Sequence, residues 1–410
     1  MFVTDVVTLE ASAHELAAAF PDPIVRQFSL KANDVAAIVG VVHALGLGAN
    51  VVSSGEWSIA RRAGVPNERI TFEGIGKADA DLRRAVRAAA DGAAPLWLAV
   101  ESMEEAAALT AIARRRGPGS DGRPPLDVLF RLNPAVSPET SAGLAVGSAG
   151  AKFGMTETEL TSAVERMVDR SGGALIPRGI HLHVGSQLGA VDAWRDAVRR
   201  GVALLALLRG GLDSFDTLDL GGGFPVAPFG QDGPRPERFA RVLWPLLEAI
   251  PEDRRPRRLA VEPGRFVVAR AGWLVARVLH IRERPAGEGD VVRQVVLDAG
   301  MTELIRPALY GARHGIVALT SHGRPTTAGP HPTATPALVE GPVCESTDHL
   351  GMHDLPPLRR GDLVAIRDAG AYGTSMGSTY NGRPRPAQVL LERDGALRLA
   401  RRRGRIADLG

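Results

Sequence analysis

Short apolar runs alternate with longer amphipathic segments over the first two thirds of the chain. In the longer segments the apolar residues recur three or four positions apart, as a helix with one buried face requires. The short runs have the length and character of strands buried in a parallel sheet. We therefore expect eight strands, at Gln27–Leu30, Ala49–Val52, Ile70–Phe72, Leu96–Val100, Val128–Leu132, Gly179–His183, Thr217–Leu220 and Leu259–Val261.

Each predicted strand except the last is followed by a helical segment. Clear helical patterns lie at Asp34–Leu45, Asp79–Ala90, Met103–Arg116, Thr156–Asp169, Ala193–Arg209 and Pro236–Ile250. Eight β-α units in about 250 residues are typical of a closed (β/α)₈ barrel, the TIM-type fold. A doubly wound open sheet is the alternative, because alternation of strands and helices does not by itself require closure.

The pattern changes after about residue 270, where long helical periods fade and Gly and Pro become frequent. Because 410 residues exceed what one hydrophobic core usually serves, two domains are expected. We predict a barrel over residues 6–268 and a β-sandwich or β-barrel domain over 269–410, joined by residues 1–5. The strands of the β domain are expected at Trp273–Ile281, Val291–Leu297, Leu363–Ile366 and Gln388–Leu391, and a surface loop is expected at Ser321–Pro336.

Composition narrows the class of protein. Hydrophobic residues make up 45% and charged residues 23% of the chain, and the net charge is only +3, which does not favour a nucleic-acid binder. We interpret the arginine runs 114–116 and 401–403 as a helix end and a tail rather than phosphate-binding patches. A single cysteine, Cys344, allows no intrachain disulfide, and neither a membrane span nor a signal peptide is apparent, so the cytoplasm is expected.

In a β/α barrel, chemistry gathers at the carboxyl ends of the strands. Here those ends carry Lys31, Ser53, Glu73, His183, the Gly221–Gly223 run and Glu262. Lys31 either extends to the surface or, desolvated at a barrel mouth, forms a Schiff base. The glycine run is either a turn or a loop whose N–H groups approach an anion. A carboxylate such as Glu262 would keep a pyridine nitrogen protonated.

Three further features have alternative interpretations. His181 and His183 lie two residues apart on one predicted strand, so their side chains point the same way. They are either histidines buried in the core, two ligands of a metal ion, or a site where the imidazole of His183 stacks on a cofactor ring. Cys344 is either an inert thiol or a reactive one beside Glu345. Tyr372 and Tyr380 lie in turn-rich segments that could be ordinary hairpins.

Taken together, these motifs resemble the fold-type III pyridoxal-phosphate (PLP) decarboxylases, and among them the diaminopimelate decarboxylase family. The resemblance covers nearly the whole chain in order, at Ser29–Asn33, Phe153–Gly154, His181–Gln187, Asp219–Gly223, Glu262–Arg265, Asp298–Tyr310, Gly341–Ser346 and Asp368–Met376. It implies an alanine racemase-like barrel with a β domain, PLP as cofactor, and a homodimer with composite active sites.

The resemblance also implies roles for individual residues. Lys31 would carry PLP and His183 would stack on its ring, while Cys344 would protonate Cα after carbon dioxide leaves. Glu262 would reach the ring nitrogen. The remaining implied cofactor ligands are Ser186, Gly222, Gly223, Gly264, Arg265 and Tyr372. The implied substrate ligands are Arg265, Arg306, Tyr310, Glu345 and Tyr372, which would hold the distal carboxylate and ammonium groups of meso-diaminopimelate.

Some positions depart from the family pattern. Asn50 stands where an aspartate is usual, and Gly223–Val226 and Gly74–Lys77 are more similar to other decarboxylases of this fold. The resemblance implies decarboxylation of meso-diaminopimelate to L-lysine. The departures point to a modified or carrier-bound amino acid as the alternative substrate, with a carrier protein as partner. An amino-acid racemase and a non-catalytic PLP-binding protein are the other hypotheses.

Overall fold

The computed structural model describes residues 1–116, 125–140, 142–227, 233–285, 291–326 and 333–409. The chain divides into two compact units. The barrel unit consists of Ser12–Pro225 and Gly233–Phe266, and the β unit consists of Met1–Ala11, Val226–Asp232 and Val267–Gly410. The boundaries expected from the sequence, 6–268 and 269–410 with 1–5, stay a prediction.

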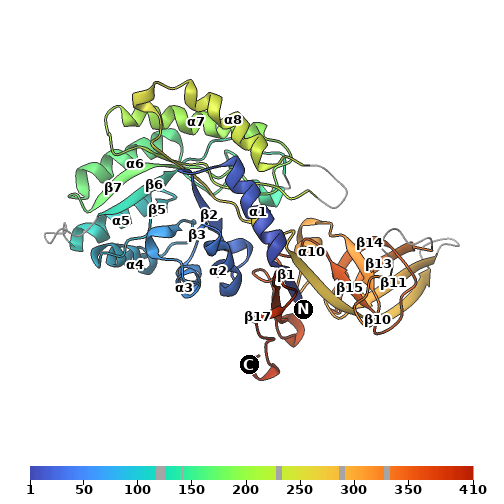
Figure 1. Ribbon diagram of the computed structural model, residues 1–410. Helices are drawn as coiled ribbons and strands as arrows, with labels where there is room; N and C mark the ends of the chain where they lie inside the picture. Colours follow the sequence, from blue (N-terminus) through green and yellow to red (C-terminus); the bar gives the residue numbers. More distant parts are fainter. Residues whose placement is uncertain (117–124, 141, 228–232, 286–290, 327–332, 410) are drawn as a thin grey trace. The chain divides into compact units, whose positions relative to one another are not determined.

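Eight parallel strands form a closed barrel, as the sequence predicts (Figure 1). Pairing of the first barrel strand with the last, at Val25 with Ala260 and Arg26 with Val261, closes the sheet and excludes the open, doubly wound alternative. The strands are β2 Val25–Ser29, β3 Gly48–Val51, β4 Ile70–Phe72, β5 Trp97–Val100, β6 Leu126–Arg131, β7 Leu175–His181, β8 Thr217–Asp219 and β9 Arg258–Val261.

Helices cover the outside of this barrel (Figure 1). Alternate strand residues point inward, and Trp97, Ala99, Leu129 and Ala260 form one buried layer of the interior. The helices of the chain are α1 Val6–Ala19, α2 Ala36–Ala44, α3 Ser54–Arg62, α4 Asp79–Ala90, α5 Met103–Arg116, α6 Glu157–Arg170, α7 Asp192–Arg209, α8 Pro236–Glu248, α9 Arg265–Val268 and α10 Arg306–Tyr310.

Local signals account for several helix ends. Thr156 accepts a hydrogen bond from the Glu159 N–H while the Glu159 carboxylate accepts from the Thr156 N–H, so a capping box starts α6. The predicted helix at Asp34 begins two residues later, because Asn33 accepts a hydrogen bond from the Val35 N–H in an extended lead-in. Helix α1 was not predicted, although its buried residues Val6, Leu9, Ala13 and Leu16 follow helical spacing.

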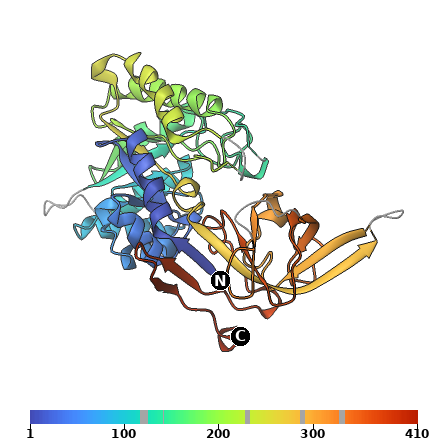
Figure 2. The same ribbon diagram turned by 45° about the vertical axis from the view of Figure 1, so that its right-hand side comes forward.

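The β unit is built on a nine-stranded sheet whose main order is β14-β13-β11-β10-β1-β16-β17, with β15 pairing β10 and β12. Strands β10 and β11 form a long antiparallel hairpin (Figure 2). The four predicted strands correspond to β10, β11, β15 and β16. The strands are β1 Phe2–Asp5, β10 Gly272–Pro285, β11 Val291–Leu297, β12 Ile316–Leu319, β13 Thr335–Glu340, β14 His349–Leu355, β15 Leu363–Ile366, β16 Gln388–Leu391 and β17 Leu397–Arg401.

One predicted boundary in this unit is wrong. The loop expected at Ser321–Pro336 ends two residues earlier, because Thr335 and Pro336 pair with Leu355 and Asp354 at the start of β13. Residues 327–332 of that loop lie outside the described residues. Short 3₁₀ helices complete the structure: η1 Leu30–Ala32, η2 Asn67–Arg69, η3 Ala142–Leu144, η4 Glu252–Arg254, η5 Tyr380–Gly382 and η6 Ile406–Asp408.

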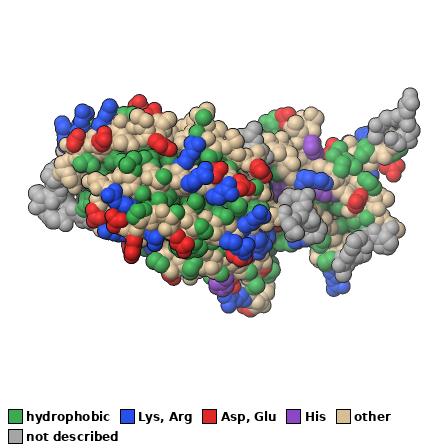
Figure 3. All heavy atoms as spheres, turned by 90° about the horizontal axis from the view of Figure 1, so that it is seen from above, with side chains coloured by type: hydrophobic (Ala, Val, Ile, Leu, Met, Phe, Trp, Pro, Cys, Tyr) green, Lys and Arg blue, Asp and Glu red, His purple; other side chains and the backbone are tan. Residues whose placement is uncertain are grey.

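The surface matches the small net charge. Basic and acidic side chains are interspersed with apolar ones on the face that Figure 3 shows. Within the described part of the chain, none of the helices has the length and apolar character needed to cross a membrane.

Candidate active site

A cavity of about 320 Å³ lies at the carboxyl ends of the barrel strands. Lys31 lines it from η1, immediately after β2, and Glu73, His183 and Glu262 line it from the residues that follow β4, β7 and β9. Four of the side chains expected from the strand ends are thus brought to one place. Ser53 is the exception: it is exposed, and its hydroxyl accepts a hydrogen bond from the Glu56 N–H to cap α3.

The floor of the cavity is a buried cluster of acids around one imidazole. His181 Nε2 lies 3.3 Å from a carboxylate oxygen of Glu73 and 3.3 Å from one of Glu262. The Asn50 side-chain amide donates to both carboxylates, at 2.7 Å to Glu73. Asp219, also fully buried, accepts a hydrogen bond from the Gly221 N–H at 2.9 Å.

Burial decides the protonation of this cluster. Burial first, and then the charge of Glu262, raises the pKa of Glu73 to about 8. Burial also raises the pKa of Asp219 well above its usual range, reinforced by Glu262 and Glu73. Burial lowers the pKa of His181 to about 4, so its ring is neutral at physiological pH. The cluster therefore keeps at least one proton near neutrality, which limits repulsion among its carboxyl groups.

The same three side chains, Glu73, His181 and Glu262, are close enough together to bind a metal ion. Asn50 already donates to a carboxylate oxygen of each acid, however, so part of their capacity to bind a cation is used. The donor set thus suits a hydrogen-bonding partner, such as a protonated ring nitrogen, better than a metal.

His183 has a defined tautomer. The Gly222 N–H donates to its Nδ1 at 3.2 Å, so Nδ1 is the acceptor and a neutral ring carries its proton on Nε2. Burial, and then the charges of Lys31 and Arg131, hold the pKa of His183 well below its usual value. His183 and Lys31 both line the cavity, and a neutral imidazole held by a hydrogen bond has the flat shape that suits stacking on an aromatic ring.

The glycines after β8 are needed for close approach of the backbone. A Cβ on Gly222 would lie 2.3 Å from the Glu262 carbonyl oxygen, and one on Gly221 would lie 2.1 Å from that of Leu182. Gly223 has φ of 102°, which side chains rarely adopt. Nearby, Arg265 donates to the Ser186 hydroxyl at 3.0 Å. The Gly223 N–H, the Ser186 hydroxyl and the Arg265 guanidinium have the chemistry to bind an anion, which fits the phosphate of PLP.

Residues that sequence reasoning missed support one wall of the cavity. Arg131 pairs with Glu101 at 2.6 Å, and its guanidinium lies 4.8 Å from the centre of the Phe153 ring. Although burial acts in the opposite direction, Arg131 lowers the pKa of Glu101 overall. The Lys77 side chain is buried and pairs with Glu105 at 2.9 Å. Arg131 and Glu101 end or follow strands β6 and β5, so the strand-end rule could have identified them.

Several predicted residues of the β unit have partners within that unit. Cys344 and Glu345 are exposed; the Asn381 amide donates to the Cys344 sulfur at 3.4 Å, and the Tyr380 hydroxyl donates to Glu345 at 2.7 Å. Near Arg306, the His314 Nδ1 donates to the Arg367 carbonyl at 2.8 Å.

That donation leaves His314 Nε2 to accept from Arg306 at 3.4 Å. Arg306 and Tyr310 open and close α10. Tyr372 is half-buried, and its backbone has a positive φ of 58°. Gly264 follows Glu262 in the barrel unit, where a Cβ would lie 3.2 Å from Ala32 and Ser29.

Comparison with known proteins agrees with this geometry. Residues 6–269 match the family model described as the pyridoxal binding domain of pyridoxal-dependent decarboxylases. The diaminopimelate decarboxylase of Aquifex aeolicus is 34% identical over 94% of this chain and 84% of its own length. That of Zymomonas mobilis is 35% identical over 93% and 84%, respectively.

Solved structures give the same result. The diaminopimelate decarboxylase of Helicobacter pylori complexed with L-lysine matches with a TM-score of 0.87 at 30% identity, over 100% of this chain and 95% of that one. The lysine/ornithine decarboxylase of Vibrio vulnificus, at 23% identity and a TM-score of 0.76, shares the fold. This chain therefore belongs to the diaminopimelate decarboxylase family of pyridoxal-dependent decarboxylases and is a PLP-dependent carboxy-lyase.

Proposed function

We propose that this enzyme decarboxylates meso-diaminopimelate to L-lysine and carbon dioxide. The observation that carries the proposal is the set of relatives named diaminopimelate decarboxylase, which align over more than nine tenths of the chain at 34% and 35% identity. Residues of the right chemistry for the distal end of this substrate are present: the cations Arg265 and Arg306 for a carboxylate, and Glu345 for an ammonium group.

The barrel residues would bind and orient the cofactor. PLP, when bound, supplies an electron sink for the electron pair that remains at Cα after the carboxylate leaves. Lys31 offers its amine for the covalent link, and the cradle of Gly222, Gly223, Ser186 and Arg265 would hold the phosphate. Glu262, fixed by His181 and Asn50, would accept a hydrogen bond from the ring nitrogen.

The β-unit residues would handle the substrate and its proton. The Cys344 thiol would deliver a proton to Cα, with the Asn381 amide holding its sulfur in place. Glu345 would bind the distal ammonium, oriented by the Tyr380 hydroxyl. Arg306, Tyr310 and Tyr372 would complete the binding of the distal carboxylate and the cofactor. A substrate that lacks the distal groups would form no ion pair with Arg306 or Glu345 and would bind poorly.

The exposure of Cys344 and Glu345 supports a second part of the proposal, a homodimer with composite sites. A proton donor and a substrate ligand need a water-excluded site, and both lie on the surface of this chain. We infer that each chain contributes this segment to the barrel of its partner, and that the enzyme works in the cytoplasm.

A modified or carrier-bound amino acid is the second candidate substrate, with a carrier protein as its partner. The observation that favours it is Asn50, which replaces a usual aspartate and contacts both Glu73 and Glu262. The test is carbon dioxide release from meso-diaminopimelate by PLP-loaded enzyme, with L-lysine measured in parallel. Equal yields of the two products support the proposal. A PLP spectrum of normal intensity without turnover would refute this substrate, and conversion to an isomer with all carbon retained would indicate a racemase.

A further inference from the structure

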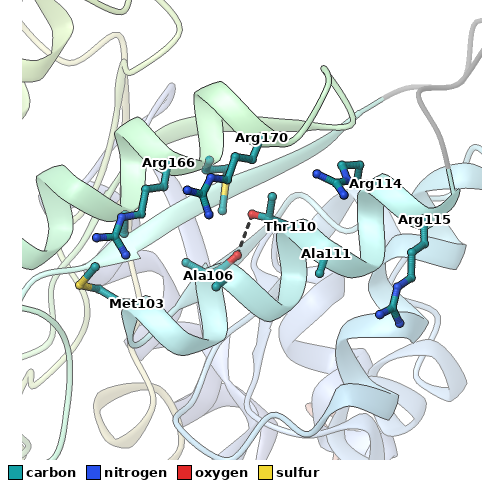
Figure 4. Close-up of a pocket in the computed structure, with 11 residues that line it drawn as sticks. Met103, Ala106, Thr110, Ala111, Arg114, Arg115, Arg166 and Arg170 are labelled. Atoms are coloured by element: carbon teal, nitrogen blue, oxygen red, sulfur yellow. Dashed lines mark hydrogen bonds between the residues drawn. The ribbon is translucent and has the colours of Figure 1, made fainter.

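A groove of about 270 Å³ runs between α5 and α6 on the outside of the barrel (Figure 4). Its floor is made of small and apolar residues, among which Ala106, Ala163 and Met167 are buried. The hydroxyl proton of Thr110 is used inside α5, where it is donated to the Ala106 carbonyl at 2.7 Å. The floor of the groove is therefore apolar.

Four arginines border this groove: Arg114 and Arg115 from α5, and Arg166 and Arg170 from α6. All four are exposed, and none of them forms an ion pair with any residue that the structure describes. Other surface arginines do find partners, such as Arg241 with Glu237 at 2.6 Å and Arg116 with Asp91 at 3.4 Å. The groove thus combines an apolar floor with a concentration of unneutralised positive charge.

The arrangement of the guanidinium groups indicates an extended ligand. Figure 4 shows Arg166 beside Met103 at one end of the groove, Arg170 over its middle and Arg114 toward the other end. They follow the groove instead of converging on one point, as they would around a single phosphate. A nucleic-acid backbone would pair with the arginines but would leave the alanine and methionine floor uncovered.

We propose that the groove between α5 and α6 binds an acidic amphipathic helix of a protein partner. The apolar face of that helix packs on Met103, Ala107 and Ala111, and its flanking carboxylates pair with the four arginines. This surface shares no residue with the lining of the cofactor cavity, so the partner binds without blocking the barrel mouth.

The proposal is tested with PLP-loaded enzyme and a fluorescein-labelled helical peptide of eighteen residues that carries leucines on one face and glutamates on both flanks. We expect saturable binding that weakens with salt. The double variant R166E/R170E should raise the Kd at least tenfold. A111W, which fills the groove and leaves its charge unchanged, should do the same. The matched control R62E/R238E changes the net charge equally at exposed arginines of α3 and α8 and should leave the Kd unchanged.

Four results would overturn the proposal. The first is equal affinity for all variants. The second is equal binding of a shuffled peptide of the same composition, since the floor would then play no part. The third is tighter binding of an eighteen-nucleotide single-stranded DNA that the same variants lose, which would indicate a nucleic-acid site. The fourth is a change in sedimentation of R166E/R170E, which would indicate that the groove joins copies of this chain.

Discussion

At the scale of single residues, the most unusual feature is the buried carboxyl group of Glu73. It faces Glu262, His181 and the Asn50 amide, and its pKa of about 8 means that it holds a proton at neutral pH. Unfolding would expose Glu73 to water, where it titrates near 4.5. Between these two pH values the folded chain binds one proton more than the unfolded chain, so its stability falls as pH rises.

The predicted fall in stability with rising pH can be tested with the variant E73Q in cofactor-free enzyme. Glutamine resembles the protonated acid and cannot ionise, so the variant does not lose this part of the stability as pH rises. Relative to wild type, E73Q should gain on the order of a few kcal/mol of unfolding free energy between pH 5 and pH 9. Thermal unfolding across that range measures the difference. If the difference in unfolding free energy between wild type and E73Q stays constant with pH, the pKa of Glu73 is the same in the folded and unfolded chain, which would contradict the prediction.

Asn50 gives the second prediction at this scale. N50D adds a carboxyl group to a fully buried set that already contains Glu73 and Glu262, and removes the amide that donates to both. We expect a loss of about 2–4 kcal/mol of stability at pH 8 and a smaller loss at pH 5, where the added group is protonated. Denaturant unfolding at the two pH values measures this. An equal loss of unfolding free energy at pH 5 and pH 8 would show that the charge of the added carboxyl group is not the cause.

At the scale of elements, the barrel positions its chemistry through the turns after its strands. The turn after β8 brings Gly221 and Gly222 against the carbonyls of Leu182 and Glu262, which no side chain would permit. The capping box at Thr156 likewise begins α6 directly after the segment that carries Phe153. The local sequence thus determines the residue at which each strand ends, and the cavity begins at these strand ends.

G222A tests this dependence of the cavity on backbone approach. The added methyl group would lie 2.3 Å from the Glu262 carbonyl oxygen, so either the turn or Glu262 must move. We expect at least a tenfold weaker affinity for PLP, measured by absorbance titration, and a lower Tm. The matched control is G150A, where a Cβ meets nothing within 4 Å and φ is ordinary. Equal effects of the two substitutions would contradict the proposed cradle.

At the scale of the whole molecule, the question is which chain completes which site. Lys31 belongs to the barrel unit, and Cys344 belongs to the β unit. If the two meet across a dimer, K31A and C344S should each be inactive alone, while a refolded mixture should regain about a quarter of wild-type activity through heterodimers with one intact site. If both residues served the same chain's site, the mixture would stay inactive, since neither chain is complete.

Several features of this protein were determined by the sequence alone. The period of its apolar residues predicted eight barrel strands and a β-rich remainder, because a buried strand and a one-sided helix have different repeats. The strand-end rule then identified Lys31, Glu73, His183 and Glu262 as neighbours, since parallel strands in a barrel present their carboxyl ends to one mouth.

Only the tertiary structure decided what these side chains do to one another. Asn50 and Glu262 lie 212 positions apart in sequence, yet a hydrogen bond from the Asn50 amide holds the Glu262 carboxylate in the acid cluster. The high pKa of Glu73 arises from burial and from a neighbour on a different strand, and neither is visible in a linear pattern. The α5–α6 groove likewise needs two helix faces side by side. Local periodicity thus specified the elements, while closure of the barrel specified which charges meet and which lose their water.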